Sequence, residues 1–598
     1  MSNYKILLLS AMAIFSGNAI AQNVGEVIDL LPEGVTINIA TDRKPAKQKA
    51  LTVCGTPQKG YKAYFAATDA EHGEELWVTD GTKEGTHMVK DIVEGTGGSN
   101  PSWMGRLNDK CLFSAYTDDA GQELWVTDGT EEGTKMICDC YSVGDGDPKS
   151  FMQMNEKQAY FIAIDDESAE YDPDGGAQYW VWVTDGTEEG THRVSDKIKV
   201  DFPGKEYTNQ MGYACVRVGR RVFFKGDDVD GHYGTELCVT DGTEAGTYLV
   251  KDINYEANQD KGDGYTRDSA IDQFVNYNNK LCHLKAWTPE YGNERWASDG
   301  TEEGTYQIWD SRTGKEANGI GISGDAFGPG AEVYRGRIWS RIATDSIGDE
   351  LGGTNCQPGD AVAYDVNDLA PTANNSAFVD PGCEFQGMYF FCATHGFDAN
   401  LPETNFGGEM WFFDGLSKPR LKYNFCPGTK SDWVKEQTVA GGSLYWYNEA
   451  NDDPSVYGNG LYRLDDKDSI PVVCPQITST GDAVFSLRNL GGQILYCSNA
   501  THRIYTFKYH KDGWDGKSDM GNLEPIFDGV TDHVDPAYVD PYLKALDPTG
   551  IENVNTEAKA ASSAVYTLDG RQVRTAGKGL QGLNKGIYIV NGKKEVVR

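Results

Sequence analysis

A block of twelve residues recurs along the chain and constrains its fold more than any other feature. The pattern Glu-Leu-Trp-Val-Thr-Asp-Gly-Thr-x-x-Gly-Thr starts at Glu75 and Glu123, and close variants run through Trp182, Cys238 and Trp296. Fainter copies occur at 363–365, 409–415, 461–465 and 504–505. The spacing of about 50 to 60 residues is typical of propeller blades. We therefore expect a ring of repeated units rather than a string of unrelated domains.

Each unit carries four short runs with the character of strands. In the second unit these are 101–104, 111–116, 123–128 and 135–139, and apolar residues alternate with polar ones in the second and third runs. Such alternation is typical of half-buried strands. Four antiparallel strands repeated many times predict an all-β fold, a β-propeller of four-stranded blades. The last two units are faint and propellers commonly have four to eight blades, so the sequence predicts eight or nine.

The Asp-Gly-Thr-x-x-Gly-Thr part of the block predicts the turn between the third and fourth strands of a blade. An Asp that ends a strand can accept a hydrogen bond from the backbone two residues on, and the Gly after it tolerates a positive φ. A calcium loop or a catalytic Asp is the alternative interpretation. A residue repeated from blade to blade does not mark one active site, which favours the turn.

These blocks resemble the ELWxxDGT repeats of a family of secreted bacterial proteins. The match is carried by Glu75-Leu-Trp77-Val-Thr-Asp80-Gly-Thr and by Glu123-Leu-Trp125-Val-Thr-Asp128-Gly-Thr. It extends over roughly residues 50 to 530. The resemblance implies a propeller and no particular chemistry.

The N-terminus predicts export. Residues 1–21 have the form of a signal peptide, with a charged start, an apolar run from Ile6 to Phe15 and small residues before Gln22. A membrane anchor is the alternative, but the run is shorter than the roughly 20 apolar residues that a span requires. No later stretch predicts a transmembrane segment in the mature chain. We take residues 22–48 as a lead-in segment, 49–530 as the propeller and 531–564 as a linker.

Residues 565–598 predict a small C-terminal β-domain with Asp569-Gly570 and Asn591-Gly592 as hairpin turns. Residues 549–598 hold eight basic and four acidic residues, whereas the whole chain has a formal charge of −36. Leu-Asp-Gly-Arg571, Lys-Gly-Ile-Tyr588 and Asn-Gly-Lys-Lys594 are similar to motifs of the sorting domain of type IX secretion cargo. The resemblance implies the type IX machinery as a partner and a secreted or outer-membrane surface location in a Gram-negative bacterium. An ordinary small β-domain is the alternative.

The net charge limits the classes of binding partner, and the positions of the cysteines indicate which disulfide bonds could form. The negative charge disfavours nucleic acid and anionic lipid. Thirteen cysteines in an exported chain suggest disulfides, yet several lie in strand-like runs where a thiol behaves as a small hydrophobe. Cys138 and Cys140 are two residues apart, a poor geometry for a bridge. Cys356 with Cys383 is the first candidate for a disulfide.

Motifs that would identify an enzyme class are absent from the sequence. No P-loop, dinucleotide fingerprint, Gly-x-Ser-x-Gly or His-Glu-x-x-His occurs. No cofactor or metal site is predicted, although the acidic stretches at 165–175 and 227–231 could hold calcium. Solvated acidic loops are the simpler interpretation.

Strand parity predicts which end of the propeller carries function. In an A-B-C-D meander the A–B and C–D turns share one end of each blade, and the B–C and D–A connections share the other. The C–D turns are uniform, whereas insertions occur in B–C at 165–178, 344–360 and 395–408, and in D–A at 254–271 and 311–328. Recognition usually resides on long loops of a rigid scaffold, unless these are solvated excursions without a partner. The candidate ligand-binding residues of this loop-rich face are Tyr171, Asp172, Asp174, Tyr255, Tyr265, Arg267, Arg312, Asp345, Glu350, His395 and Asp398.

Three functions are compatible with the sequence. The first is a secreted or cell-surface protein without enzymatic activity, whose loop-rich face binds a glycan or a protein. The second is a hydrolase of carbohydrate or peptide that draws carboxylates from several blades. The third is a structural envelope protein. Catalytic residues are not predicted, because residues of different blades converge only in space.

Overall fold

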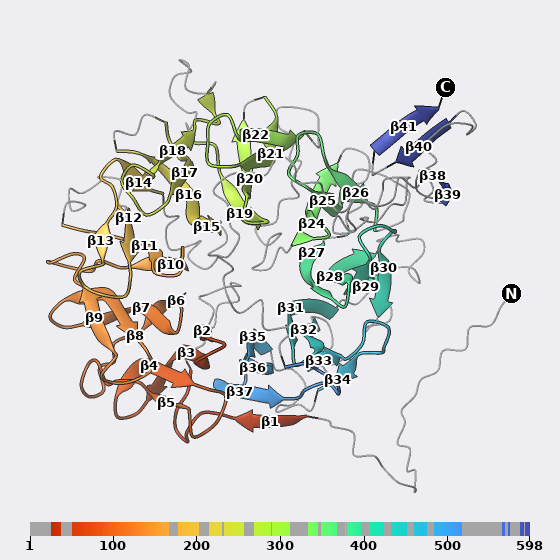
Figure 1. The fold of residues 1–598 in the computed structure, drawn as a ribbon. Helices are drawn as coiled ribbons and strands as arrows, with labels where there is room; N and C mark the ends of the chain where they lie inside the picture. The colour runs from red at the N-terminus through yellow and green to blue at the C-terminus, as the bar shows by residue number, and fades with distance from the viewer. Residues whose placement is uncertain are drawn as a thin grey trace, which may run out of the picture.

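The computed structural model describes most of the propeller and the strands at the C-terminal end. The described residues are 25–37, 51–166, 178–201, 215–229, 233–255, 268–288, 290–310, 333–344, 348–366, 377, 379–395, 406–423, 432–450, 460–474, 484–516 and the backbone of four strands between 565 and 597. They form nine antiparallel blades arranged around a ring, as Figure 1 shows, and one further four-stranded sheet. The predicted propeller is confirmed, with nine blades rather than eight.

The blades follow one another along the chain. Blade one consists of β2 (Thr52–Thr56), β3 (Gly60–Asp69), β4 (Gly73–Thr79) and β5 (His87–Met88). Blade two consists of β6 (Ser102–Leu107), β7 (Lys110–Thr117), β8 (Gly121–Thr127) and β9 (Lys135–Cys138). Blade three consists of β10 (Lys149–Gln153), β11 (Ala159–Ala163), β12 (Trp180–Thr184) and β13 (His192–Arg193). Blade four has five strands, β14 (Ile198–Val200), β15 (Cys215–Val218), β16 (Arg221–Asp228), β17 (Glu236–Thr240) and β18 (Tyr248–Lys251). Blade five consists of β19 (Asp272–Tyr277), β20 (Leu281–Thr288), β21 (Gly292–Ser298) and β22 (Thr305–Trp309). Blade six consists of β23 (Val333–Tyr334), β24 (Arg337–Thr344), β25 (Gly348–Thr354) and β26 (Val362–Tyr364).

The remaining blades complete the ring. Blade seven consists of β27 (Asp380–Phe385), β28 (Met388–His395), β29 (Phe406–Phe413) and β30 (Arg420–Tyr423). Blade eight consists of β31 (Asp432–Ala440), β32 (Ser443–Ala450), β33 (Gly460–Leu464) and β34 (Val472–Val473). Blade nine is β35 (Val484–Leu490), β36 (Gln493–Ser498), β37 (Arg503–Lys508) and β1 (Glu26–Asp29). The further sheet is β38 (Val565–Thr567), β39 (Gln572–Arg574), β40 (Gly586–Val590) and β41 (Lys593–Val597), in the order β39-β38-β40-β41. Among the described residues there is no helix that is both long and apolar enough to cross a bilayer.

The N-terminal strand closes the ring. In Figure 1 the red strand β1 lies beside the blue strand β37, and their register pairs Glu26 with Lys508. The guanidinium of Arg503 holds this junction, because its Nε lies 2.6 Å from Oδ2 of Asp29 and its Nη1 donates to the carbonyl of Val35 at 2.9 Å. The lead-in segment that the sequence analysis set ahead of the propeller therefore supplies the outer strand of the last blade.

The apolar core lies between neighbouring blades. Leu112 of blade two and Phe161 of blade three belong to one buried cluster. Another cluster joins Leu30 and Leu31, which follow β1, to Phe65 of blade one and Leu495 of blade nine. Each blade thus buries its apolar surface against its neighbours, so closure of the ring is part of its stability.

The uniform C–D turns explain the repeated block. In blade two, Oδ1 of Asp128 accepts hydrogen bonds from N and Oγ1 of Thr130 at 2.9 and 2.6 Å, and Gly129 has a φ of +89°. A Cβ on Gly133 would lie 2.1 Å from Oδ1 of the same Asp, so this position accepts only Gly. The same Asp–Thr hydrogen bonds recur at Asp80, Asp185, Asp241 and Asp299. The block is therefore a structural turn, as predicted.

The glutamate of the block is buried and holds the connection to the next blade. The two carboxyl oxygens of Glu123 accept hydrogen bonds from the backbone N–H groups of Cys140 at 2.7 Å and Gly146 at 2.6 Å. Both donors belong to the D–A connection that leads to blade three. Burial raises the pKa of Glu123 to about 8, and burial raises the pKa of the equivalent Glu236 to about 8.

Blade six departs from the sequence prediction. The faint copy at 363–365 is the fourth strand of the blade, and β25 is the third strand that carries the block. The expected insertion at 344–360 is therefore wrong, because this stretch contains β25, Gly348–Thr354, and the connection from β25 to β26. Gly352 and Gly353 stand where the blocks of blades one to three have Trp-Val. A Cβ on Gly352 would lie 2.2 Å from the side chain of Ile342 in β24, and one on Gly353 would lie 2.6 Å from the ring of Trp339. Side chains of the neighbouring strand fill the space that the Trp and Val of the block would take, which hides the repeat.

The expected disulfide between Cys356 and Cys383 is also wrong. Both thiols are buried and free, and so is every other cysteine among the described residues except that Cys138 is only partly buried. Cys356 packs in the cluster between blades five and six, whereas Cys383 packs in the cluster between blades seven and eight. The two side chains therefore serve different interfaces as small apolar groups.

Candidate functional site

The structure describes three of the predicted ligand-binding residues. Tyr255 follows β18 on a D–A connection and is 61% exposed. His395 is the last residue of β28, directly before the B–C connection of blade seven, and its backbone pairs with that of Phe406, the first residue of β29. The others lie outside the described residues: Tyr171, Asp172, Asp174, Tyr265, Arg267, Arg312, Asp345 and Asp398.

Glu350 is not exposed toward a ligand. Its side chain is fully buried and one of its carboxyl oxygens accepts a hydrogen bond from the backbone N–H of Val366 at 2.8 Å. This is the position of Glu123 in blade two, so Glu350 is the glutamate of the hidden block in blade six. We correct its assignment from a binding residue to a residue that holds the connection between blades.

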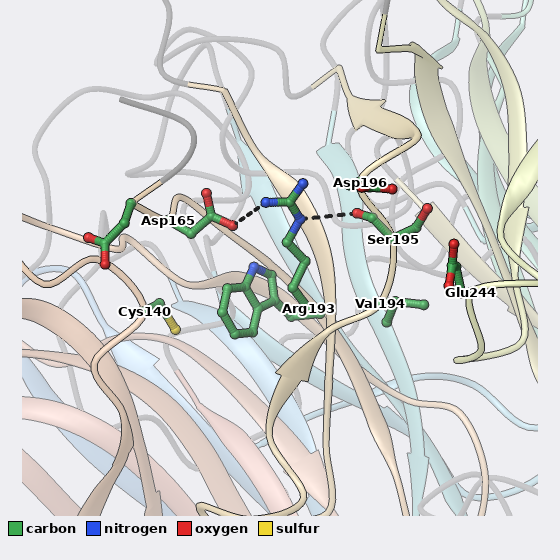
Figure 2. A pocket seen from close by; sticks show the side chains of 9 residues that line it. Cys140, Asp165, Arg193, Val194, Ser195, Asp196 and Glu244 are labelled. Atoms are coloured by element: carbon green, nitrogen blue, oxygen red, sulfur yellow. Dashed lines mark hydrogen bonds and ion pairs between the residues drawn. The ribbon is translucent and has the colours of Figure 1, made fainter. Parts of the chain in front are cut away.

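A pocket opens beside the first of the predicted insertions. It has a volume of about 490 Å³ and we call it the rim pocket. Asp165 and Asp166 form part of its wall, and they are the first residues of the B–C connection of blade three. The pocket is lined by Cys140, Asp165, Asp166, Trp182, Arg193, Val194, Ser195, Asp196 and Glu244 (Figure 2).

Arg193 is held in a fixed orientation in the rim pocket. Figure 2 shows it pointing to Asp165, and its Nη1 lies 2.7 Å from Oδ2 of that residue. Its Nε donates to the carbonyl of Ser195 at 3.1 Å, and its guanidinium carbon lies 3.9 Å from the ring centroid of Trp180. A guanidinium fixed by an ion pair, a carbonyl and an aromatic face needs little ordering when a ligand arrives.

The acidic side of the rim pocket is held by hydrogen bonds from blade two. Oδ1 of Asp166 accepts from N and Oγ of Ser142 at 2.9 and 2.8 Å. On the far side, Glu244 of the C–D turn of blade four pairs with Lys197 at 2.8 Å. The pocket thus combines fixed donors and acceptors with the indole of Trp182, a lining that suits a polar ligand such as a sugar or a peptide segment.

A second polar cluster lies between blades two and three on the loop-rich face. Nζ of Lys149 donates to the hydroxyl of Tyr179 at 2.9 Å, and that hydroxyl donates to Oδ2 of Asp147 at 2.6 Å. Lys149 also lies 5.8 Å from the ring centroid of the partly buried Trp103. Burial, and then the charge of Asp147, raise the pKa of Tyr179 above its ordinary value.

Sequence reasoning missed the residues of both sites because they stand at the ends of regular strands. Arg193 ends β13, Lys149 begins β10 and Trp103 lies in β6. The predicted binding residues were instead taken from the insertions between strands. The available signal was position: each of these residues lies next to a B–C or D–A connection.

The described parts of the acidic stretches give no metal cluster. The residues that the structure describes contain no group of three or more His, Cys, Asp or Glu side chains arranged to hold a metal ion. In the stretch at 227–231, Oδ1 of Asp227 accepts hydrogen bonds from the backbone N–H groups of Asp228 at 2.8 Å and Tyr233 at 3.3 Å. In these contacts Asp227 organises a turn.

Comparison with known proteins yields likeness of shape alone. No protein-family model matches the chain, and no curated protein matches it. Among solved structures, a prolyl endopeptidase aligns with 10% identity and a TM-score of 0.30 over 69% of this chain and 56% of its own. A puromycin hydrolase aligns with 12% identity and a TM-score of 0.31, over 71% of this chain and 63% of its own. The acylaminoacyl peptidase of Pyrococcus horikoshii aligns with 10% identity and a TM-score of 0.28, over 68% of this chain and 58% of its own. The chain thus spans less than two thirds of each of these proteins, and such similarity identifies no activity.

Proposed function

We propose that this protein is a secreted or cell-surface binding protein of the ELWxxDGT-repeat type, whose loop-rich face takes a glycan or a protein segment without catalysis. The observation that supports this most is the rim pocket. Asp165 and Asp166 belong to both the pocket wall and the start of a variable insertion, and Arg193 is already fixed between Asp165 and Trp180. Variable loops around fixed polar groups on a rigid ring are a common arrangement for recognition.

The distribution of perturbed carboxyl groups favours binding over hydrolysis. Catalytic acids and bases need a pKa tuned to their task, and such groups cluster in active sites. Burial raises the pKa of Glu75, Glu123 and Glu236, the glutamates of the repeated block that bind backbone N–H groups between blades. Burial also raises the pKa of Asp227, which accepts backbone N–H groups, and that of Asp272, whose Oδ2 lies 3.8 Å from Nζ of Lys285. Their perturbation follows from a structural role.

A binding screen with matched variants tests the proposal. The purified propeller would be applied to a glycan array and to a peptide library, together with a panel of glycoside and peptide hydrolase substrates. For a ligand found in this way, Asp166→Asn should weaken binding about tenfold or more, because it removes the charge and retains an acceptor for Ser142. Glu132→Gln, in the C–D turn of blade two and outside the lining of the rim pocket, is the control and should leave binding unchanged. Turnover in the hydrolase panel, or equal losses in both variants, would contradict the proposal.

We further propose that residues 549–598 direct the chain to the cell surface through type IX secretion. Support comes from the motifs at Arg571, Tyr588 and Lys594 and from the four-stranded sheet that follows the ring in the chain. Fusion of residues 549–598 to an exported reporter should bring the reporter to the surface of a type IX-competent host. Retention of the reporter in the periplasm would contradict this.

A further inference from the structure

One thiol of the rim pocket wall, that of Cys140, is in direct contact with a second thiol. Cys138 ends β9 and Cys140 begins the connection to blade three, and their Sγ atoms lie 2.8 Å apart. The sequence predicted a poor geometry for bonding because alternate residues of a strand share a face without touching. The strand ends at Cys138, so the backbone is free to turn and bring the second thiol back to the first.

Access distinguishes this pair from the other cysteines. Cys138 is the one described cysteine that is not buried, and Cys140 lines the rim pocket. The backbone of the segment is already fixed, because N of Cys140 donates to the buried carboxyl of Glu123 and Ser142 holds Asp166. Thiol–disulfide exchange requires an accessible attacking sulfur and a second sulfur within reach, and this segment provides both.

We propose that Cys138 and Cys140 form a redox-active dithiol that a low-molecular-weight disulfide oxidises reversibly to an intramolecular bridge. The thiolate of Cys138 attacks one sulfur of the disulfide R–S–S–R, forms a mixed disulfide and releases R–S⁻. The thiolate of Cys140 then attacks Sγ of Cys138, which forms the protein bridge and releases the second R–S⁻. The two protons lost by the cysteines are recovered as two R–SH, so the protein loses two electrons and the small disulfide gains them.

A consequence for the rim pocket follows from the position of the pair. The bridge ties the end of β9 to the start of the connection that carries Ser142, the donor to Asp166. Oxidation therefore removes a thiol from the pocket wall and limits the movement of the segment that positions Asp166.

Peptide mapping of the full chain tests the proposal directly. The native protein would be equilibrated in glutathione buffers of increasing oxidised fraction, denatured in the presence of an alkylating reagent and digested with trypsin. Cleavage after Lys135 and Lys149 gives a peptide, 136–149, whose only cysteines are Cys138 and Cys140. In reducing buffer it should carry two alkyl groups once denatured. In oxidising buffer it should carry no alkyl group, and its mass should be that of the unmodified dithiol peptide less two hydrogen atoms.

Two variants and one internal control keep the result interpretable. Cys140→Ser should trap the first step as a glutathione adduct on Cys138, and Cys138→Ser should abolish the bridge without an adduct. Cys392, buried in β28, should take an alkyl group after denaturation in both buffers, and Cys392→Ser should leave the bridge intact. Two alkylated thiols in peptide 136–149 under oxidising conditions, or bridges from Cys138 to another chain, would overturn the proposal.

Discussion

Replacing Glu123 by Gln isolates the role of the buried glutamate in joining one blade to the next. Both carboxyl oxygens accept backbone N–H groups, from Cys140 at 2.7 Å and from Gly146 at 2.6 Å. An amide has one acceptor oxygen, so its NH₂ group must face one of the two donors. A hydrogen bond to an uncharged group is worth about 0.5–1.5 kcal/mol, and a buried donor left without a partner costs about 1–3 kcal/mol. We expect the free energy of unfolding to fall by about 3 kcal/mol.

Urea unfolding followed by tryptophan fluorescence measures this effect. Glu132→Gln, an exposed residue in the C–D turn of the same blade, is the control and should change stability by less than about 0.5 kcal/mol. Hydrogen exchange should locate the loss, with faster exchange at the amides of Cys140 and Gly146 in the Glu123→Gln variant.

The pH dependence provides a second test of the same residue. Burial raises the pKa of Glu123 to about 8 from its ordinary value of 4.5, so the folded chain keeps a proton that the unfolded chain releases between these values. The contribution to stability is complete below about pH 4.5 and is lost as the pH rises through about 8. The urea midpoint of the wild type should therefore decrease from about pH 5 to about pH 9, and by less in Glu123→Gln. A Glu123→Gln variant with wild-type stability and wild-type pH dependence would refute the reasoning.

Three further predictions concern the ring itself. Arg503→Met should lower the free energy of unfolding by about 3 kcal/mol and speed hydrogen exchange in β37, because it leaves Asp29 and the carbonyl of Val35 without their donor; unchanged exchange would count against the junction. Gly133→Ala should lower it by about 1–3 kcal/mol in the same urea assay, because its Cβ would lie 2.1 Å from a carboxyl oxygen of Asp128. Deletion of blade three, residues 149–193, should prevent recovery of a soluble chain with a cooperative thermal transition, whereas an open solenoid would tolerate the deletion.

The sequence predicted the elements that depend on local chemistry. The Asp-Gly-Thr turns and the strands on either side of them follow from hydrogen bonds within a few residues, and the structure has them where the block predicts. Strand parity also predicted the blade-three B–C connection that begins at Asp165 and meets the rim pocket. In these cases one short segment determines its own conformation.

Features that depend on packing between segments were not predictable. Two glycines replace the Trp and Val of the block in β25, because Ile342 and Trp339 of β24 fill the space beside Gly352 and Gly353, and no single motif records such packing between strands. The left-handed residues Trp103 and Ser150, with φ values of 51° and 59°, lie in bulges of the innermost strands of two adjacent blades without any Gly to signal them. Closure by β1 joins residues nearly a whole chain apart, which periodicity does not reveal.

A cross-link between β1 and β37 tests the central claim that the N-terminal strand closes a nine-bladed ring. Glu26 and Lys508 are partners in the register of these strands, so Glu26→Cys with Lys508→Cys should form an intramolecular disulfide under mild oxidation. The account predicts altered mobility of the native chain without reductant, and a linked peptide pair in a tryptic map. The same variant oxidised in urea, and the pair Glu33→Cys with Lys508→Cys, should give neither. Free thiols at both positions in the native double variant, or links between separate chains only, would contradict the closed ring.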